Sequence, residues 1–324
     1  MARLKGKKDA LIRIGISTCL LGQKVRFDGG HKRDRFITDL LGEYFEFVPI
    51  CPEVDIGMGV PREAVHLAGD QDNPRIVGSR SDKDWTDRMN RYSVKKAKQI
   101  DKHNLSGYIL KAKSPSCGME RVKLYTLDGK GTDQRTIGLY ARHILERYPL
   151  LPVEEEGRLN DAVLRENFIV RVFAYHRLQH LFVDSYKRAD VIRFHTIHKY
   201  LLLAHSPGHY KSLGQLVAAV KQTTPSEFRQ RYSALFMEGL RLKSTTAKNT
   251  NVLMHMAGFV RNHADDDDRK RLQQVIEDYR KQLVPLIVPM TLLRHFVEKF
   301  NVEYLADQIY LTPHPKEMML RNHV

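Results

Sequence analysis

The pattern of apolar and polar residues changes character about half-way along the 324-residue chain. In the first half, short apolar runs alternate with turn-rich segments, and three runs predict strands: residues 12–17 (IRIGIS), 45–50 (FEFVPI) and 106–111 (SGYILK). Between the last two, residues 82–103 carry apolar positions at helical spacing with few helix breakers. Strands that alternate with helices predict an α/β domain with a mainly parallel sheet.

Beyond residue 150 the pattern becomes helical. The stretch from Leu150 to Gly157 combines a proline with three glutamates, and we interpret it as the junction between domains of residues 1–155 and 156–324. After it, glycine and proline become rarer and long segments place apolar residues at helical spacing. These segments are residues 160–183, 188–204, 210–221, 225–240, 248–258, 266–282 and 289–300. The second domain is therefore expected to be predominantly α-helical.

Composition bears on the compartment and on the class of partner. No run of about 18 or more apolar residues occurs, so no transmembrane helix is expected. Arg13 interrupts the first apolar run and no small-residue cleavage site follows, which favours a cytoplasmic protein. Lys and Arg number 53 against 38 Asp and Glu, a net charge of +15, and both halves carry a positive excess. This excess suits a polyanion such as RNA, although a basic surface that only aids solubility stays open.

Three cysteines, Cys19, Cys51 and Cys117, are the candidate centre of the chemistry. Each follows the carboxyl end of a predicted strand, the edge at which open α/β sheets gather their ligands, so all three can converge there. An odd number of cysteines in a chain without a secretion signal argues against a disulfide framework. Each lies in a turn-prone setting beside small residues or proline, which favours a shared functional role over a structural one.

Three chemistries are open for these thiols. A zinc ion would need a fourth ligand, for which His31 and His66 are the nearest candidates. A [4Fe–4S] cluster is normally held by four cysteines, so three would leave one iron with an open position that can act as a Lewis acid on a substrate sulfur. A cysteine nucleophile without a metal is the third possibility, and it would not need the other two thiols.

The segments around the cysteines carry a family resemblance. STCLLG, CPEVDIGMGVPRE and KSPSCG together resemble the thiouracil desulfidase family over residues 10–150. The whole chain resembles the two-domain relatives of that family, the tRNA 4-thiouridine desulfidases. The resemblance implies a [4Fe–4S] cluster with Cys19, Cys51 and Cys117 as its ligands, whose free iron takes the sulfur of a thiocarbonyl group.

The same resemblance implies catalytic roles for Glu53 and Ser114, which occupy the motif positions of the acid–base pair. A carboxylate two residues from Cys51 could activate the water that must add to the carbon bearing sulfur. Ser116 competes with Ser114 for the second role, because both precede Cys117 in the same motif. The implied reaction involves no net redox change, since sulfide leaves and oxygen from water replaces it.

Most of the 15 histidines lie in the second half. Three pairs have a spacing that could put two rings on one helical face: His176 and His180, His195 and His198, and His205 and His209. Such a face could bind a metal, but histidines of a core or polar network are the commoner case.

The second half also resembles the accessory domain fused to these desulfidases, over most of residues 160–324, which implies a helical substrate-binding module. Aromatic and basic residues are interleaved there, and rings can stack on bases while lysines bind phosphates. Lys199, Tyr210 and Lys211 are the candidate RNA contacts. An amphipathic helical core with one solvated face would account for many of the same residues.

The leading hypothesis is a desulfidase that converts 4-thiouridine in tRNA to uridine, after the thiolated base leaves its stack. One alternative is a desulfidase of a free thiolated base or nucleoside such as thiouracil. Another is a non-catalytic RNA-binding protein with a structural metal site. Activity on the free base against activity on tRNA separates the first two, and zinc in place of iron would indicate the third.

Overall fold

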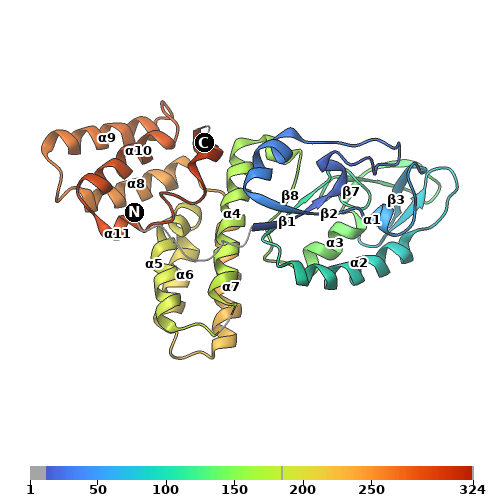
Figure 1. Ribbon diagram of the computed structural model, residues 1–324, viewed down its shortest axis with the longest axis horizontal. Coiled ribbons are helices and arrows are strands. Elements are labelled where there is room, and N and C mark those ends of the chain that lie inside the picture. The colour runs from blue at the N-terminus through green and yellow to red at the C-terminus, as the bar shows by residue number, and fades with distance from the viewer. Residues whose placement is uncertain (1–11, 184, 323–324) are drawn as a thin grey trace. The chain divides into compact units, whose positions relative to one another are not determined.

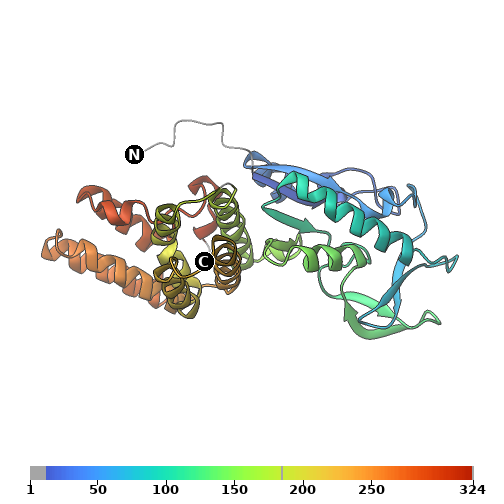
Figure 2. The same ribbon diagram turned by 90° about the horizontal axis from the view of Figure 1, so that it is seen from below.

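The computed structural model describes residues 12–183 and 185–322. Two compact units divide between Leu159 and Asn160. The first combines strands with helices and the second is helical, as Figures 1 and 2 show. This confirms the expected fold class, an α/β domain followed by a predominantly α-helical one. Each helix in the described ranges is too short or too polar to cross a membrane.

A parallel sheet forms the centre of the first unit. Its strands, in spatial order, are β2 (Phe45–Ile50), β1 (Ile12–Ser17), β5 (Gly107–Leu110) and β8 (Val153–Glu155). Every neighbouring pair is parallel. Ser17 lies opposite Ile50, and Ile16 lies opposite Ile109. The strands β1, β2 and β5 therefore end at one edge of the sheet, within a residue or two of the predicted bounds.

Close packing at the centre of this sheet depends on a glycine. Gly15 of β1 is paired with Tyr108 of β5, whose side chain is fully buried. A Cβ atom at Gly15 would lie 2.5 Å from the Tyr108 ring. All four residues of β5 are buried, as expected for an inner strand covered on both faces.

The segment read as a domain junction belongs to the first unit, because Val153–Glu155 is the edge strand β8. Its glutamates are buried and hydrogen-bonded. Glu154 Oε1 accepts a hydrogen bond from Arg158 Nε at 2.6 Å, and Glu155 Oε1 accepts one from the Met119 amide at 2.8 Å. Glutamates that are typical of a linker thus form hydrogen bonds inside the first unit. The boundary between the two units lies a few residues later in the chain.

A second sheet in this unit was not predicted. Its strands, in spatial order, are β4 (Pro74–Gly78), β3 (Val65–Gly69), β6 (Val122–Tyr125) and β7 (Gly131–Thr136). The inner pair is parallel and the two outer pairs are antiparallel. β7 reads GTDQRT and buries only its last residue, so no apolar alternation marks it in the sequence.

The helices of the first unit are short except for α2. They are α1 (Pro52–Asp55), α2 (Thr86–Ile100) and α3 (Leu139–Arg147), with turns η1 (Thr18–Leu21), η2 (Phe36–Leu40), η3 (Leu41–Glu43), η4 (Asp101–His103) and η5 (Arg158–Asn160). α2 and α3 pack against each other, and they lie side by side in Figures 1 and 2. The helix predicted over 82–103 begins later, because Asp84 still bridges to Val77 of β4.

The second unit contains every helix predicted for it. They are α4 (Ala162–Leu181), α5 (Arg188–His205), α6 (Pro207–Ala218), α7 (Pro225–Arg241), α8 (Thr246–Val260), α9 (Asp266–Arg280) and α10 (Ile287–Lys299). The short α11 (Glu303–Ala306) and the turns η6 (Lys316–Met318) and η7 (Leu320–Asn322) follow, and they were not predicted. α6 begins earlier than expected because Ser206 caps it through the His209 amide and Pro207 occupies its first turn.

Candidate active site

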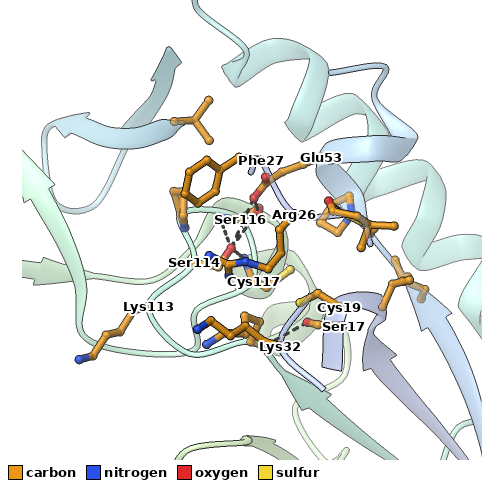
Figure 3. A pocket seen from close by; sticks show the side chains of 18 of the residues that line it. Ser17, Cys19, Arg26, Phe27, Lys32, Glu53, Lys113, Ser114, Ser116 and Cys117 are labelled. Atoms are coloured by element: carbon orange, nitrogen blue, oxygen red, sulfur yellow. Dashed lines mark hydrogen bonds between the residues drawn. The ribbon is translucent and has the colours of Figure 1, made fainter. Parts of the chain in front are cut away.

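The carboxyl edge of the parallel sheet opens into a cavity of about 430 Å³ (Figure 3). Cys19, Cys51 and Cys117 all line it. Cys19 lies in η1 directly after β1, Cys51 directly after β2, and Cys117 in the loop after β5. The structure thus brings together three residues that are remote in sequence, because their strands are neighbours and end at the same edge.

Tight turns position two of these cysteines. Gly22, with a φ of 90°, ends η1 and donates its amide to the Cys19 carbonyl at 3.3 Å. On the other loop, Ser114 Oγ accepts a hydrogen bond from the Cys117 amide at 3.2 Å. A Cβ atom at Gly118 would lie 2.4 Å from Val122 Cγ2. The KSPSCG loop therefore needs a glycine at this position to adopt its conformation.

Burial raises the pKa of all three thiols. The pKa of Cys19 rises to about 11, first through burial and then through the neighbouring Cys51. The pKa of Cys117 lies well above its usual value because of burial and the Glu53 carboxylate. A raised pKa disfavours a free cysteine nucleophile, which reacts as the thiolate, whereas a bound metal cation deprotonates a coordinating thiol.

Glu53, in α1, points its carboxylate into the same cavity and is held there by Arg62. Glu53 Oε2 accepts from Arg62 Nη2 at 2.5 Å and from Nε at 3.1 Å. The two side chains are 13% and 6% exposed. Arg62 Nη1 also donates to the carbonyls of Val25, at 3.0 Å, and Gly59, at 2.9 Å. The guanidinium is thus satisfied within the fold, and the carboxylate has one orientation.

The other carboxylate oxygen faces the two serines of the KSPSCG loop. Ser116 Oγ donates to Glu53 Oε1, and Ser114 Oγ lies 3.5 Å from the same atom. The two serine hydroxyls are 3.2 Å apart. Ser116 is fully buried, whereas Ser114 is partly exposed. Figure 3 shows Ser114, Ser116 and Glu53 in a row above Cys117.

Comparison with known proteins bears on this unit directly. Residues 14–156 match the family model of 2-thiouracil desulfurase, and this range includes the three cysteines, Glu53 and both serines. Residues 199–315 match a protein family of unknown function, DUF1722. The chain belongs to the 2-thiouracil desulfurase family. The family gives the class of reaction, removal of sulfur, and this desulfurase carries the DUF1722 domain after its α/β unit.

Individual relatives cover parts of the desulfurase. The uncharacterized protein YbgA of Escherichia coli (strain K12) is 30% identical over 162 residues, which are 48% of this chain and 94% of YbgA. The uncharacterized protein YbbK of Bacillus subtilis (strain 168) is 31% identical over 120 residues, 36% of this chain and 79% of YbbK. The solved structure of the [4Fe–4S]-dependent thiouracil desulfidase TudS is 28% identical and covers 46% of this chain and 93% of its own, with a TM-score of 0.37.

The cavity of the desulfurase also contains residues that the sequence did not single out. Ser17 Oγ accepts a hydrogen bond from the Lys111 amide at 3.0 Å, and the Ser17 hydroxyl lowers the pKa of the Cys117 thiol against the effect of burial. Lys111 Nζ lies 2.5 Å from Glu156 Oε1. Ser17 is the last residue of β1 and Lys111 directly follows β5. Their positions at the ends of predicted strands could have identified them as residues of the cavity.

Three basic side chains contribute to the wall of the cavity. Arg26, Lys32 and Lys113 line it. Arg26 Nε lies 3.4 Å from Asp28 Oδ1, but Lys32 and Lys113 form no ion pair within residues 12–183 and 185–322. Lys113 points away from the cysteines in Figure 3. Lys32 and Lys113 are exposed, so the cavity offers two cations to an anionic group.

The proposed RNA contacts of the desulfurase lie on two adjacent helices of the second unit. Lys199, on α5, places its ammonium 5.0 Å from the centre of the Tyr200 ring and 4.8 Å from that of Tyr304. Tyr210 and Lys211 are on α6, where Tyr210 is half-buried and Lys211 is exposed.

The histidine pairs differ in whether their two rings share a helical face. His176 and His180 lie on one face of α4, with their Nε2 atoms 3.1 Å apart. The expectation of a shared face is wrong for His205 and His209, because α5 ends at His205 and α6 begins after it. Within the part of the chain that the structure describes, no three His, Cys, Asp or Glu side chains are grouped to hold a single metal ion.

Proposed function

We propose that this desulfurase converts 4-thiouridine in tRNA to uridine and sulfide, with a [4Fe–4S] cluster held by Cys19, Cys51 and Cys117. The observation that carries the proposal is one cavity, inside the matched region, that is lined by three thiols and a carboxylate. The family supports the removal of sulfur. The tRNA-borne base and the ligands of the cluster are our proposals.

The residues of the cavity fit such a cluster. The chain has three cysteines in all, and each thiolate of a cluster binds its own iron, so the sulfurs must surround a volume rather than meet at one ion. Lys111 and Arg26 favour the thiolate of Cys19, because they oppose the effect of burial on its pKa. When bound, a cluster with three protein ligands supplies an open iron as a Lewis acid for the sulfur of the substrate.

The protein's own groups supply the proton transfers. A water molecule adds to the carbon that bears sulfur, and Glu53 accepts its proton while the C–O bond forms. Arg62 keeps the Glu53 carboxylate in place, since it holds the oxygen that the serines do not use. Ser116 and Ser114 provide a hydroxyl path for that proton to reach the departing sulfur. As the C–S bond breaks, the added hydroxyl gives up its second proton by the same path and becomes the carbonyl oxygen. Sulfide leaves as H₂S with both protons of the water, and no electrons are gained or lost.

The cavity and the charge of the chain support a thiolated base borne on RNA. A volume of about 430 Å³ suits one base rather than a folded strand, so the base must leave its stack to enter. The net charge of +15 favours a polyanion. We assign tRNA binding to the helical unit, with Lys199, Tyr210 and Lys211 as contacts.

The deciding experiment measures sulfide release from 4-thiouridine-containing tRNA by anaerobically reconstituted protein, with iron measured on the same sample. Sulfide should appear as 4-thiouridine becomes uridine. Replacing Cys19, Cys51 or Cys117 by serine should remove both iron and activity, while Glu53→Gln should retain iron and lose turnover. A cysteine variant with full iron and activity would overturn the ligand assignment, and an active Glu53→Gln would remove Glu53 from the mechanism.

Free thiouracil is the second candidate substrate. The family's own name specifies 2-thiouracil, and a free base fits the cavity as well as a flipped one. The two candidates differ in their dependence on salt, because only tRNA binding releases counterions. A kcat/KM that is higher for the free base, and that tRNA does not inhibit, would favour this alternative.

A further inference from the structure

A second cavity adjoins the candidate active site. Its volume is about 490 Å³, and it shares Arg62 and Val65 with the first cavity. Arg80, Lys83 and Trp85 also line it. These three belong to the segment that connects β4 to α2, so the unpredicted second sheet carries this cavity.

Backbone hydrogen bonds, such as that from the Gly78 amide to the Lys83 carbonyl at 2.9 Å, and the Glu63 carboxylate hold the connecting segment. Glu63 Oε2 accepts hydrogen bonds from the Arg80 and Ser81 amides, both at 3.1 Å, and the Ser81 hydroxyl donates to Glu63 Oε1. These bonds lower the pKa of Glu63. Gly78 admits the carboxylate, because a Cβ atom there would lie 2.5 Å from Glu63 Oε1. The backbone is thus fixed while the side chains of Arg80 and Lys83 extend from it.

Of the charged side chains in the second cavity, two have partners within the protein and two do not form ion pairs with described residues. Arg62 is paired with Glu53, and Glu63 is occupied by the donors of the turn. Arg80 and Lys83 are exposed, and neither forms an ion pair with any residue the structure describes. Lys83 Nζ lies 4.1 Å from the centre of the Trp85 ring, which holds the ammonium at the cavity wall. Two cations are therefore available to an anion.

We propose that this second cavity binds a phosphate of the polynucleotide strand that carries the thiolated base. The inference rests on the proposed function, since a base in the first cavity leaves its sugar and phosphates at the opening. The shared wall at Arg62 and Val65 places the second cavity directly beside the first, within reach of the strand that such a base would carry. Arg80 and Lys83 would then fix the position of the strand without reading its sequence. They would favour a base on a strand over a free base.

The test compares two variants with equal changes of charge in the full-length, reconstituted protein. The first is Arg80→Gln with Lys83→Met. The control is Lys95→Gln with Lys98→Met, which removes two exposed cations from α2. For the first variant, kcat/KM on thiolated tRNA should fall about tenfold, and the log–log salt slope of tRNA binding should decrease by about 1, as for one lost phosphate contact. Turnover of free 4-thiouracil should change less than twofold, and the control should match the unmodified protein throughout.

Two outcomes would overturn the inference. One is unchanged tRNA kinetics and salt slope in the first variant. The other is an equal loss on free 4-thiouracil, which would mean that the turn only supports the active site. If the unmodified protein releases no sulfide from either substrate, the proposed function fails instead. The affinity for tRNA and its salt slope, measured without turnover, would still test the cavity. Trp85, the single tryptophan, reports through its fluorescence whether the segment keeps its structure.

Discussion

At the scale of the residue, Glu53 divides its two carboxylate oxygens between different partners. One is bound by Arg62 and the other faces Ser116 and Ser114. The cysteines and Glu53 could be identified from sequence because they lie within short motifs. The pairing of Glu53 with Arg62 could not be predicted. It depends on the conformation of the loop after α1, which the spacing of apolar residues does not indicate.

The two serines should have separable effects. Ser116→Ala removes the hydroxyl that donates to Glu53 but leaves the Cys117 amide bonded to Ser114, so we expect turnover to fall about 100-fold with iron content unchanged. Ser114→Ala also removes the acceptor of the Cys117 amide, so we expect it to lose both turnover and part of the iron. Iron analysis and sulfide release on the same samples would check this, and equal iron in both variants would contradict it.

At the scale of the element, the sites depend on where strands end and loops close. The strands of the parallel sheet are apolar runs and could be predicted, whereas β8 and β7 are rich in charged or polar residues and could not. The helices of the second unit were predicted well because their apolar spacing is regular and their ends carry capping residues.

Gly118 should be indispensable to the loop that carries Cys117. Gly118→Ala would place a Cβ atom 2.4 Å from Val122 Cγ2 and 2.9 Å from the Ser114 carbonyl oxygen, so the loop must move. We expect the reconstituted variant to lose most of its iron. Gly258→Ala, in open space on α8, is the matched control and should retain iron with stability equal or up to about 1 kcal/mol higher. Full iron in the Gly118 variant would contradict the prediction.

The helical unit should lose stability on mild acidification. Burial lowers the pKa of His198 to about 3 and, with help from Arg321, that of His314 to about 4. A histidine with a folded pKa below its unfolded value contributes stability above about pH 6.5, and this is lost as the pH falls towards the folded pKa. Urea unfolding followed by far-UV circular dichroism between pH 7.5 and 4.5 should show the decline. His198→Leu should reduce the dependence by up to one proton, and an unchanged slope would contradict the assignment.

At the scale of the whole molecule, the net charge is +15, and each of the two units carries more basic than acidic residues. It could be read from composition, and so could the division into an α/β and a helical part. The second sheet and its cavity could not. β3, β4 and β6 each contain charged, glycine or proline residues, and β7 is polar, so none of them stands out as an apolar run.

Salt should separate the two substrates. Raising KCl from 50 to 200 mM should weaken tRNA binding by at least about tenfold and leave turnover of free 4-thiouracil nearly constant, because only the polyanion releases counterions. Lys199→Gln with Lys211→Gln should lower the tRNA affinity and its salt slope. Filter binding and sulfide release would measure both effects, and an affinity for tRNA that does not depend on salt would contradict the assignment of tRNA as partner.

The register between β1 and β2 has a consequence for how the protein is assembled in the cell. Ser17 is aligned with Ile50, so the chain enters the Cys19 and Cys51 turns from adjacent hydrogen-bonded strands. Strand pairing therefore fixes where the two turns begin, and a slip of one residue would turn every side chain of a strand to the opposite face. We therefore expect the scaffold to form before the proposed cluster is bound. Loss of that cluster would then end activity without unfolding the protein, and activity would return once the cluster is rebuilt on the same polypeptide.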